Sequence, residues 1–161
     1  VDESTGLQCS RPEDDNFEHT QTIVGGASVY RGLASATKAA AAMHRITGKS
    51  RYADQALRYA RRRDALGQAI EKHYWDGEEG YYGRRKGSPR PRAAMPAFLR
   101  PVDDPRMENH LKSMWSNVRP TFEGKEDQGL YEAKELIGLG IAARESENPV
   151  VGLDKVRKGV N

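Results

Sequence analysis

Apolar and polar positions follow one another along this chain with the period of an α-helix, in which residues three and four apart share a face. One such face runs from Ile23 to His44, and a second runs from Tyr52 to Tyr74. Followed to the C-terminus, the pattern predicts five helices, at residues 20–46 (or from Ser28), 50–74, 93–99, 105–119 and 130–144. The chain is therefore expected to be all-α.

A short link joins the first two predicted helices. Gly48 follows the last apolar turn of the first helix and suits the left-handed conformation that often ends a helix. The Ser50 hydroxyl can cap the N-terminus of the second helix. Because so few residues separate the two helices, they are expected to pack antiparallel as a helical hairpin.

Glycine and proline mark the remaining boundaries. Gly77 and Gly80 lie in an acidic turn between aromatic residues, which predicts a small β-hairpin after the second helix. The run Asp103-Asp104-Pro105 places acidic capping residues before a proline at the first helical position, which predicts a helix start. Pro120 is expected to end that helix, and Asn148-Pro149 the last one.

Length and hydropathy bound the organisation of the chain. Its 161 residues suit one helical domain over residues 1–148, followed by a basic tail over residues 149–161 that is expected to be disordered. No apolar run reaches the length needed to cross a membrane. Residues 1–5 show no basic region before an apolar stretch, so no signal peptide is visible and a cytoplasmic location is expected.

Charge and rare residue types narrow the kinds of site. Lys and Arg total 26 against 23 Asp and Glu, and the net charge of +3 does not indicate a nucleic-acid partner. Two denser clusters, Arg61–Arg63 and Gly83–Gly87, are typical of solvated surfaces, and the second lacks the interleaved aromatic residues of a strand-binding surface. Cys9 is the only cysteine and no histidines have zinc-ligand spacing, so no disulfide or metal site is expected.

The order of the helices predicts where the loops lie. Helices that alternate in direction place every second loop at the same end of a bundle. The segment before the first helix and the loops at residues 75–92 and 119–129 then share one end, and long loops on a rigid scaffold often carry function. Their carboxylates and rings are those of Glu13, Asp14, Asp15, Glu18, His19, Trp75, Glu78, Glu79, Tyr81, Tyr82, Glu123, Glu126 and Asp127.

Carboxylates beside aromatic rings are the groups that carbohydrate chemistry uses. Rings stack on the apolar faces of sugars, one carboxylic acid protonates the leaving oxygen, and a second carboxylate about 6.5–9.5 Å away activates water for inversion. The alternative is that these carboxylates are solvated surface charges. Trp75, Tyr81 and Tyr82 can equally seal their loop onto the bundle, and His19 can cap the first helix.

Four stretches resemble the glucoamylase-type glycoside hydrolases. The first, residues 13–22, has paired acidic residues before a His-Thr. The second, residues 46–52, is similar to a TGD-x-x-Y turn, and the third, residues 69–76, is similar to AI-x-x-x-F-W-D. The fourth, residues 95–107, resembles an LP-x-x-GFL…DDPR run. The resemblance covers about residues 13–120 of the chain.

The resemblance implies part of an (α/α)6 toroid and an inverting hydrolase of α-glucosides that needs no cofactor. Glu13 matches the general acid of the family, and Asp14 matches a neighbouring acidic residue that contacts sugar hydroxyls. Pro12 stands where the family usually has Trp, and Asp14 replaces a more usual Glu. The general base of the family lies in a last hairpin beyond these stretches, so Glu126 is chosen for that role from the loop order alone. The expected substrate-binding residues are Asp14, His19, Trp75, Tyr81 and Tyr82.

The number of helices leaves two functions open. A closed toroid needs about twelve helices, whereas five are predicted, so the chain is expected to self-associate or to bury its open face in a second chain. The first hypothesis is a glycoside hydrolase, or a fragment of one, with an oligo- or polysaccharide substrate. The alternative is a non-catalytic helical-hairpin module that binds a protein or a polyanion.

Overall fold

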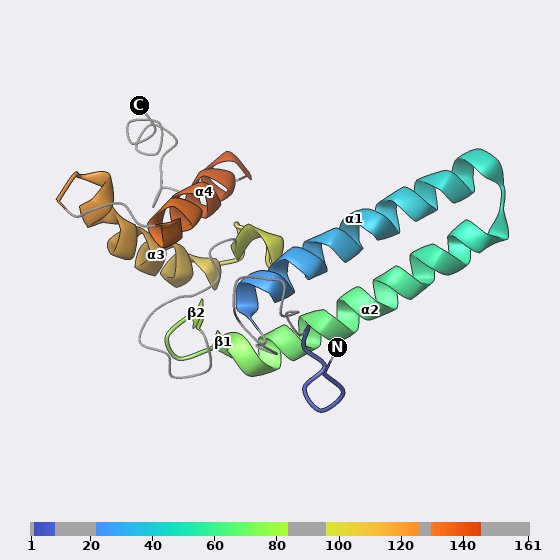
Figure 1. The fold of residues 1–161 in the computed structure, drawn as a ribbon, viewed down its shortest axis with the longest axis horizontal. Helices are drawn as coiled ribbons and strands as arrows, with labels where there is room; N and C mark the ends of the chain where they lie inside the picture. Colours follow the sequence, from blue (N-terminus) through green and yellow to red (C-terminus); the bar gives the residue numbers. More distant parts are fainter. Residues whose placement is uncertain (1, 9–21, 84–95, 126–129, 146–161) are drawn as a thin grey trace. The chain divides into compact units, whose positions relative to one another are not determined.

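The computed structural model describes residues 2–8, 22–83, 96–125 and 130–145. Its elements, labelled in Figure 1, are α1 (Ile23–Thr47), α2 (Ser50–Tyr74), β1 (Trp75–Asp76), β2 (Tyr81–Tyr82), the 3-10 helix η1 (Pro96–Phe98), α3 (Met107–Phe122) and α4 (Leu130–Glu145). The predicted all-α class is confirmed. The chain divides into two compact units, an N-terminal unit (Val1–His73) and a C-terminal unit (Tyr74–Asn161).

Both ends of α1 are held by capping hydrogen bonds. The Thr22 hydroxyl oxygen accepts a hydrogen bond from the Gly25 N–H at 3.1 Å, so the helix begins at Ile23, between the two predicted starts. At the other end Gly48 has a φ of 66°, a left-handed conformation that disfavours residues with a Cβ. Its N–H donates to the His44 carbonyl oxygen, and the predicted end of the helix is confirmed.

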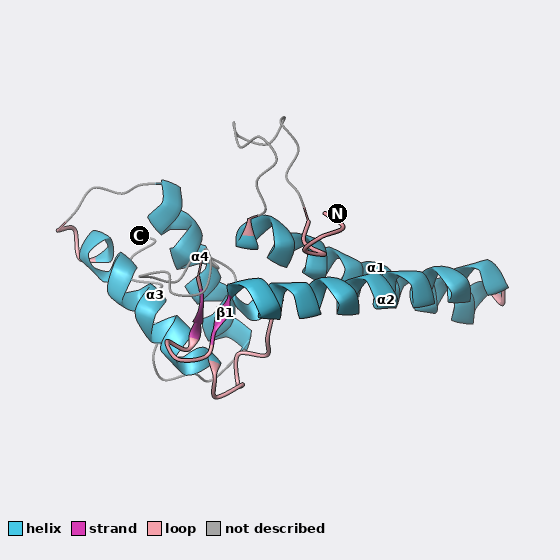
Figure 2. Ribbon diagram, turned by 90° about the horizontal axis from the view of Figure 1, so that it is seen from below, coloured by secondary structure: helices cyan, strands magenta, loops and turns pink. Residues whose placement is uncertain are grey.

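Helices α1 and α2 run antiparallel, side by side, as the predicted hairpin (Figures 1 and 2). Glycines allow the close approach: a Cβ at Gly26 would lie 3.4 Å from the Ile70 side chain, and a Cβ at Gly67 would lie 2.9 Å from the Tyr30 ring. The buried side chains of the hairpin are those of Ile23, Ala27, Ala40, Leu66, Ala69, Ile70 and Tyr74. Most of them lie near the end of the hairpin away from the Gly48 turn.

Residues 2–8 form an irregular turn. The Asp2 carboxylate accepts hydrogen bonds from the backbone N–H and the hydroxyl of Ser4, at 2.8 and 2.5 Å. These bonds lower the pKa of Asp2 below its ordinary value. Leu7, near the end of the turn, is buried.

The predicted β-hairpin follows α2 directly. The Asp76 carboxylate accepts hydrogen bonds from the N–H groups of Glu78 and Glu79, at 3.1 and 3.2 Å, and thereby fixes the turn. Gly80 closes the turn with a φ of 72°, and a Cβ at this position would lie 2.9 Å from the Asn109 side chain of α3. The strands pair antiparallel, with Trp75 opposite Tyr82 and Asp76 opposite Tyr81.

Helix α3 begins two residues later than predicted. Asp104 caps the segment, because its Oδ1 accepts a hydrogen bond from the Arg106 N–H at 3.0 Å. The next two N–H groups bond three residues back, from Met107 to the Asp104 carbonyl oxygen at 2.8 Å and from Glu108 to that of Pro105 at 3.3 Å. This tighter turn delays the α-helical bonding, so the helix starts at Met107.

Pro120 does not end α3, which continues to Phe122. Proline has a backbone φ that fits a helix, but it has no N–H and so removes one hydrogen bond of the last turn. The Lys125 N–H bonds to the Pro120 carbonyl oxygen beyond the helix end. The helix predicted over residues 93–99 is also corrected, since its described part is only the 3-10 turn η1.

In the C-terminal unit α4 packs against α3 and η1. The helical spacing of Met107, Leu111, Met114 or Trp115, and Val118 predicts an inner face for α3, and the buried residues of the helix are Met107, His110, Leu111, Met114, Val118 and Thr121. The buried residues of α4 are Glu135, Gly138, Leu139, Ala142 and Ala143, whereas Ile137 is 56% exposed. Apolar residues occur on several sides of this helix. Its small buried residues, Gly138, Ala142 and Ala143, allow close packing against neighbouring elements.

Within the ranges described above, no helix is long and apolar enough to cross a membrane. The predicted tail, residues 149–161, lies outside the described residues.

Candidate functional site

The residues predicted to perform acid–base chemistry fall outside the described part of the chain. These are Glu13 and Glu126, and the predicted substrate-binding residues Asp14 and His19 also lie outside it. The loops predicted to share one end belong to both units, so their common location also stays a prediction. The described site residues are the three aromatic residues of the β-hairpin, in the C-terminal unit.

These three rings form part of the interior. Tyr82 is fully buried and Tyr81 is buried, while Trp75 is half-buried. The rings of Trp75 and Tyr82 meet edge to face with centroids 4.8 Å apart. Burial, followed by the nearby carboxylates of Glu79 and Asp76, raises the pKa of Tyr81 above its ordinary value. This geometry favours the alternative in which the rings seal the hairpin onto the helices.

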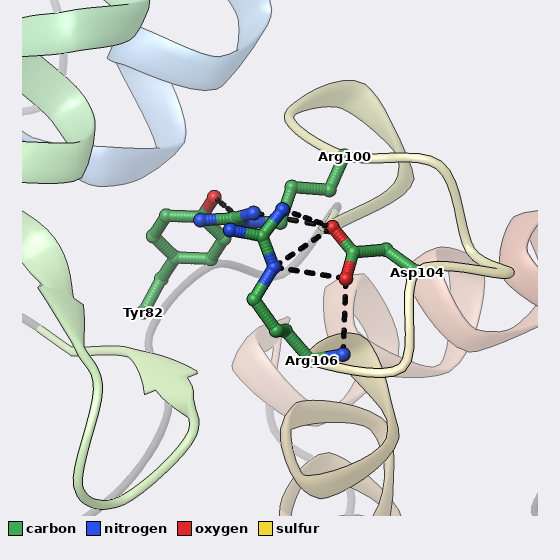
Figure 3. Close-up of polar contacts among 4 residues, drawn as sticks. All are labelled: Tyr82, Arg100, Asp104 and Arg106. Carbon is green, nitrogen blue, oxygen red and sulfur yellow. Dashed lines mark hydrogen bonds and ion pairs between the residues drawn. The ribbon is translucent and has the colours of Figure 1, made fainter.

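Arg100 joins the Tyr82 ring to Asp104, just before α3, as Figure 3 shows. Its Nε donates a hydrogen bond to the Tyr82 hydroxyl oxygen at 2.5 Å, and its Nη1 lies 3.2 Å from Oδ2 of Asp104. The guanidinium carbon lies 4.5 Å from the centre of the Trp75 ring. Arg100 is 8% exposed, so one buried cation is shared by a carboxylate, a hydroxyl and a ring face.

Asp104 holds both arginines of this group. Arg106 binds it through Nε at 2.9 and 3.0 Å and through Nη2 at 2.5 Å, in addition to its backbone N–H (Figure 3). The Arg106 guanidinium, the Arg106 N–H and Arg100 lower the pKa of Asp104 well below its ordinary value, although burial opposes this shift. The carboxylate is therefore ionised and fully engaged at neutral pH.

His110 completes the group from α3. Its ring is buried, and its Nδ1 lies 3.1 Å from the backbone nitrogen of Tyr82, which can only donate. Nδ1 must therefore accept, so the imidazole is neutral with its proton on Nε2. The His110 and Tyr82 rings meet edge to face at 5.9 Å. The hydrogen bond attaches the second strand to α3.

We call the five residues Trp75, Tyr82, Arg100, Asp104 and His110 the buried polar cluster. Every one of its charged and polar groups described above is held by another protein group, which suits a structural joint rather than a reacting centre. Sequence reasoning did not identify Arg100 or His110. The spacing of His110 between Met107 and Met114 is core spacing and could have located it, whereas no local pattern marks Arg100 as buried.

A metal site is not formed by the described residues, among which no three His, Cys, Asp or Glu side chains gather. Comparison of the chain with protein-family models, with curated proteins and with solved structures gives no match.

Proposed function

We propose that this chain is a glucoamylase-like glycoside hydrolase, or a part of one, that acts on α-glucosides by inversion. The observation that carries the proposal is the composition of the buried polar cluster. Trp75 comes from the third stretch that resembles the family, and Asp104 comes from the fourth. Arg100, which also belongs to the fourth stretch, contacts the side chains of both Trp75 and Asp104.

This contact supports the proposal because it gives the resemblance a physical basis. The two stretches are far apart in sequence, and their motif residues are joined through one buried cation. Side chains that pack on each other must be complementary in shape. A helical-hairpin scaffold of this family would therefore need both stretches together, and this chain has both. The described rings then support the loops, and the chemistry is assigned to the carboxylates.

In the proposed mechanism Glu13 acts as the general acid and protonates the leaving glycosidic oxygen. A second carboxylate, for which Glu126 is the candidate, removes a proton from water on the opposite face of the sugar. Asp14 and His19 orient the substrate hydroxyls. The reaction transfers protons and needs no cofactor.

The proposal is tested by measuring glucose release from maltooligosaccharides. The wild type is expected to release glucose, and Glu13→Gln is expected to lower the rate by at least about 100-fold, because an amide cannot supply the proton. Glu3→Gln, which changes an exposed carboxylate of the same segment, is the matched control. Equal rates for the wild type and Glu13→Gln, or no release by either, would refute the proposal.

A second candidate function is a non-catalytic module whose hairpin binds another chain. Exposed apolar side chains favour it: Ile46 is 78% exposed and Leu57 is 57% exposed. We infer that a second chain, or a second copy of this one, covers these side chains. Binding of a second chain is also compatible with the hydrolase proposal, in which the partner would supply the missing helices of the toroid.

A further inference from the structure

A short repeat lies on α2. Arg51-Tyr52-Ala53 recurs as Arg58-Tyr59-Ala60, seven residues later. Seven residues are close to two helical turns, so the two copies lie on the same side of the helix, about 10 Å apart along its axis. Both arginines are exposed and both tyrosines are half-buried. The repeat therefore presents two guanidinium groups in one row.

The first arginine of the row is held in place. Its Nη2 donates a hydrogen bond to the Tyr52 hydroxyl oxygen at 2.9 Å, and its guanidinium carbon lies 4.7 Å from the centre of the Tyr52 ring. Within the described part of the chain neither Arg51 nor Arg58 forms an ion pair. Asp54 lies one turn before Arg58 on the exposed side of the helix, but the two side chains form no ion pair. An exposed pair at this spacing would be weak in any case. A cation that is positioned but not neutralised is suited to an external anion.

The surrounding charge favours anions as well. Between Ile23 and Tyr74 there are ten Lys and Arg residues and three Asp and Glu residues, a net charge of +7, whereas the whole chain carries +3. Arg61 and Arg62, which are also exposed, extend the row by one turn. Positive charge concentrated in this way attracts a negatively charged polymer at low ionic strength.

We propose that this row of arginines on α2 binds a linear acidic polysaccharide. The guanidinium fork matches a carboxylate or sulfate group in two parallel hydrogen bonds. The spacing favours a polymer with sparse charges, because one strand of a nucleic acid carries a phosphate about every 3.4 Å, far more densely than the arginines are placed. The row includes none of the carboxylates of the proposed hydrolase, so it stands whether or not the chain is active.

The test measures binding of fluorescently labelled hyaluronate, a polysaccharide with one carboxylate per disaccharide, to the full chain at low salt. The double variant Arg51→Gln/Arg58→Gln removes the row, and glutamine preserves the helix propensity. The matched control is Lys38→Gln/Lys72→Gln, which removes the same charge from exposed positions of the same hairpin. Circular dichroism checks that all variants retain their helix content.

The expected result is saturable binding that weakens with salt and falls roughly tenfold in the arginine variant, with a smaller loss in the lysine control. An equal loss in both variants would show general charge attraction and overturn the assignment of the row. Tighter binding of a single-stranded RNA than of hyaluronate at the same salt would overturn the class of ligand. Absence of hyaluronate binding, or equal binding of uncharged dextran, would overturn the whole proposal.

Discussion

Arg100 brings a positive charge into the interior of the C-terminal unit, where Trp75, Tyr82 and Asp104 surround it. A buried cation is tolerated only when it is paired and hydrogen-bonded, and this one is both. Arg106 binds the same carboxylate from the surface, with 59% of its side chain exposed. Both arginines bind Asp104, but only Arg100 is buried and also contacts the Tyr82 hydroxyl and the Trp75 ring.

This difference predicts the effect of removing each arginine. Arg100→Ala is expected to lower the free energy of unfolding by about 2–4 kcal/mol, because it removes the buried hydrogen bond to the Tyr82 hydroxyl and one of the two arginines on Asp104, and leaves a gap beside Trp75. Arg106→Ala, the matched control, is expected to cost less than about 1 kcal/mol. Urea unfolding followed by circular dichroism measures both. Equal losses would show that burial of Arg100 does not matter.

The carboxylates of Asp104 and Glu123 predict the response of stability to acid. Hydrogen bonds from Lys125 and Arg119 lower the pKa of Glu123 from 4.5 to about 2, and that of Asp104 is also lowered from 3.8. A lowered pKa means that the folded state binds fewer protons than the unfolded chain. The stabilisation is therefore complete above about pH 5 and is lost as the pH falls toward 2.

Thermal unfolding between pH 7 and pH 2 tests this response. Asp104→Asn is expected to be less stable than the wild type at pH 7 and to lose less of its melting temperature on acidification. Asp103→Asn, a change at the exposed neighbouring residue, is the control and should follow the wild type. A pH profile of Asp104→Asn parallel to that of the wild type would contradict the role of this carboxylate.

Among the elements, the hairpin of α1 and α2 depends on where its glycines lie. A Cβ at Gly67 would meet the Tyr30 ring at 2.9 Å, whereas a Cβ at Gly32, on the exposed side of α1, would meet nothing within 4 Å. Gly67→Ala is expected to destabilise the hairpin, and Gly32→Ala to stabilise it by about 0.5–1 kcal/mol through helix propensity. Chemical denaturation gives both values. A gain at both positions would show that the Tyr30 ring moves aside without cost.

The elements also show which parts of the fold the sequence predicts. The end of α1 was predictable, because Gly48 acts locally. Helix α2 also spans the predicted residues. The start of α3 was not predictable. It depends on the tight turn after Asp104, and Asp104 is held by its contact with Arg100. The buried face of α4 was not predictable, because its apolar residues do not mark one side. Local signals fix helix ends, and packing partners fix helix faces.

In the candidate site too, local signals were predictable from the sequence and packing contacts were not. The positions of Trp75, Tyr81 and Tyr82 in a β-hairpin were predictable from the glycines beside them. Their burial was not, because it depends on Arg100 and His110, which reach them from distant parts of the sequence. The carboxylates proposed for catalysis lie outside the described residues.

At the scale of the whole molecule, exposed apolar side chains predict association. Ile46 and Leu57 are more than half exposed on the hairpin. Light scattering after gel filtration is expected to show a mass above 17.9 kDa for the wild type, or a shift of that mass when a partner chain is added. Ile46→Gln/Leu57→Gln should return it to the monomer. A monomeric wild type that no partner shifts would contradict this prediction.

The central claim is that the chain belongs to an inverting hydrolase of α-glucosides, with Glu13 as its acid. Proton NMR of the glucose first released from maltotriose tests it most directly, because inversion of an α-linkage yields the β-anomer. We expect the β-anomer to appear before mutarotation with the wild type, and no early product with Glu13→Gln. Release of the α-anomer first, or unchanged release by Glu13→Gln, would contradict the claim.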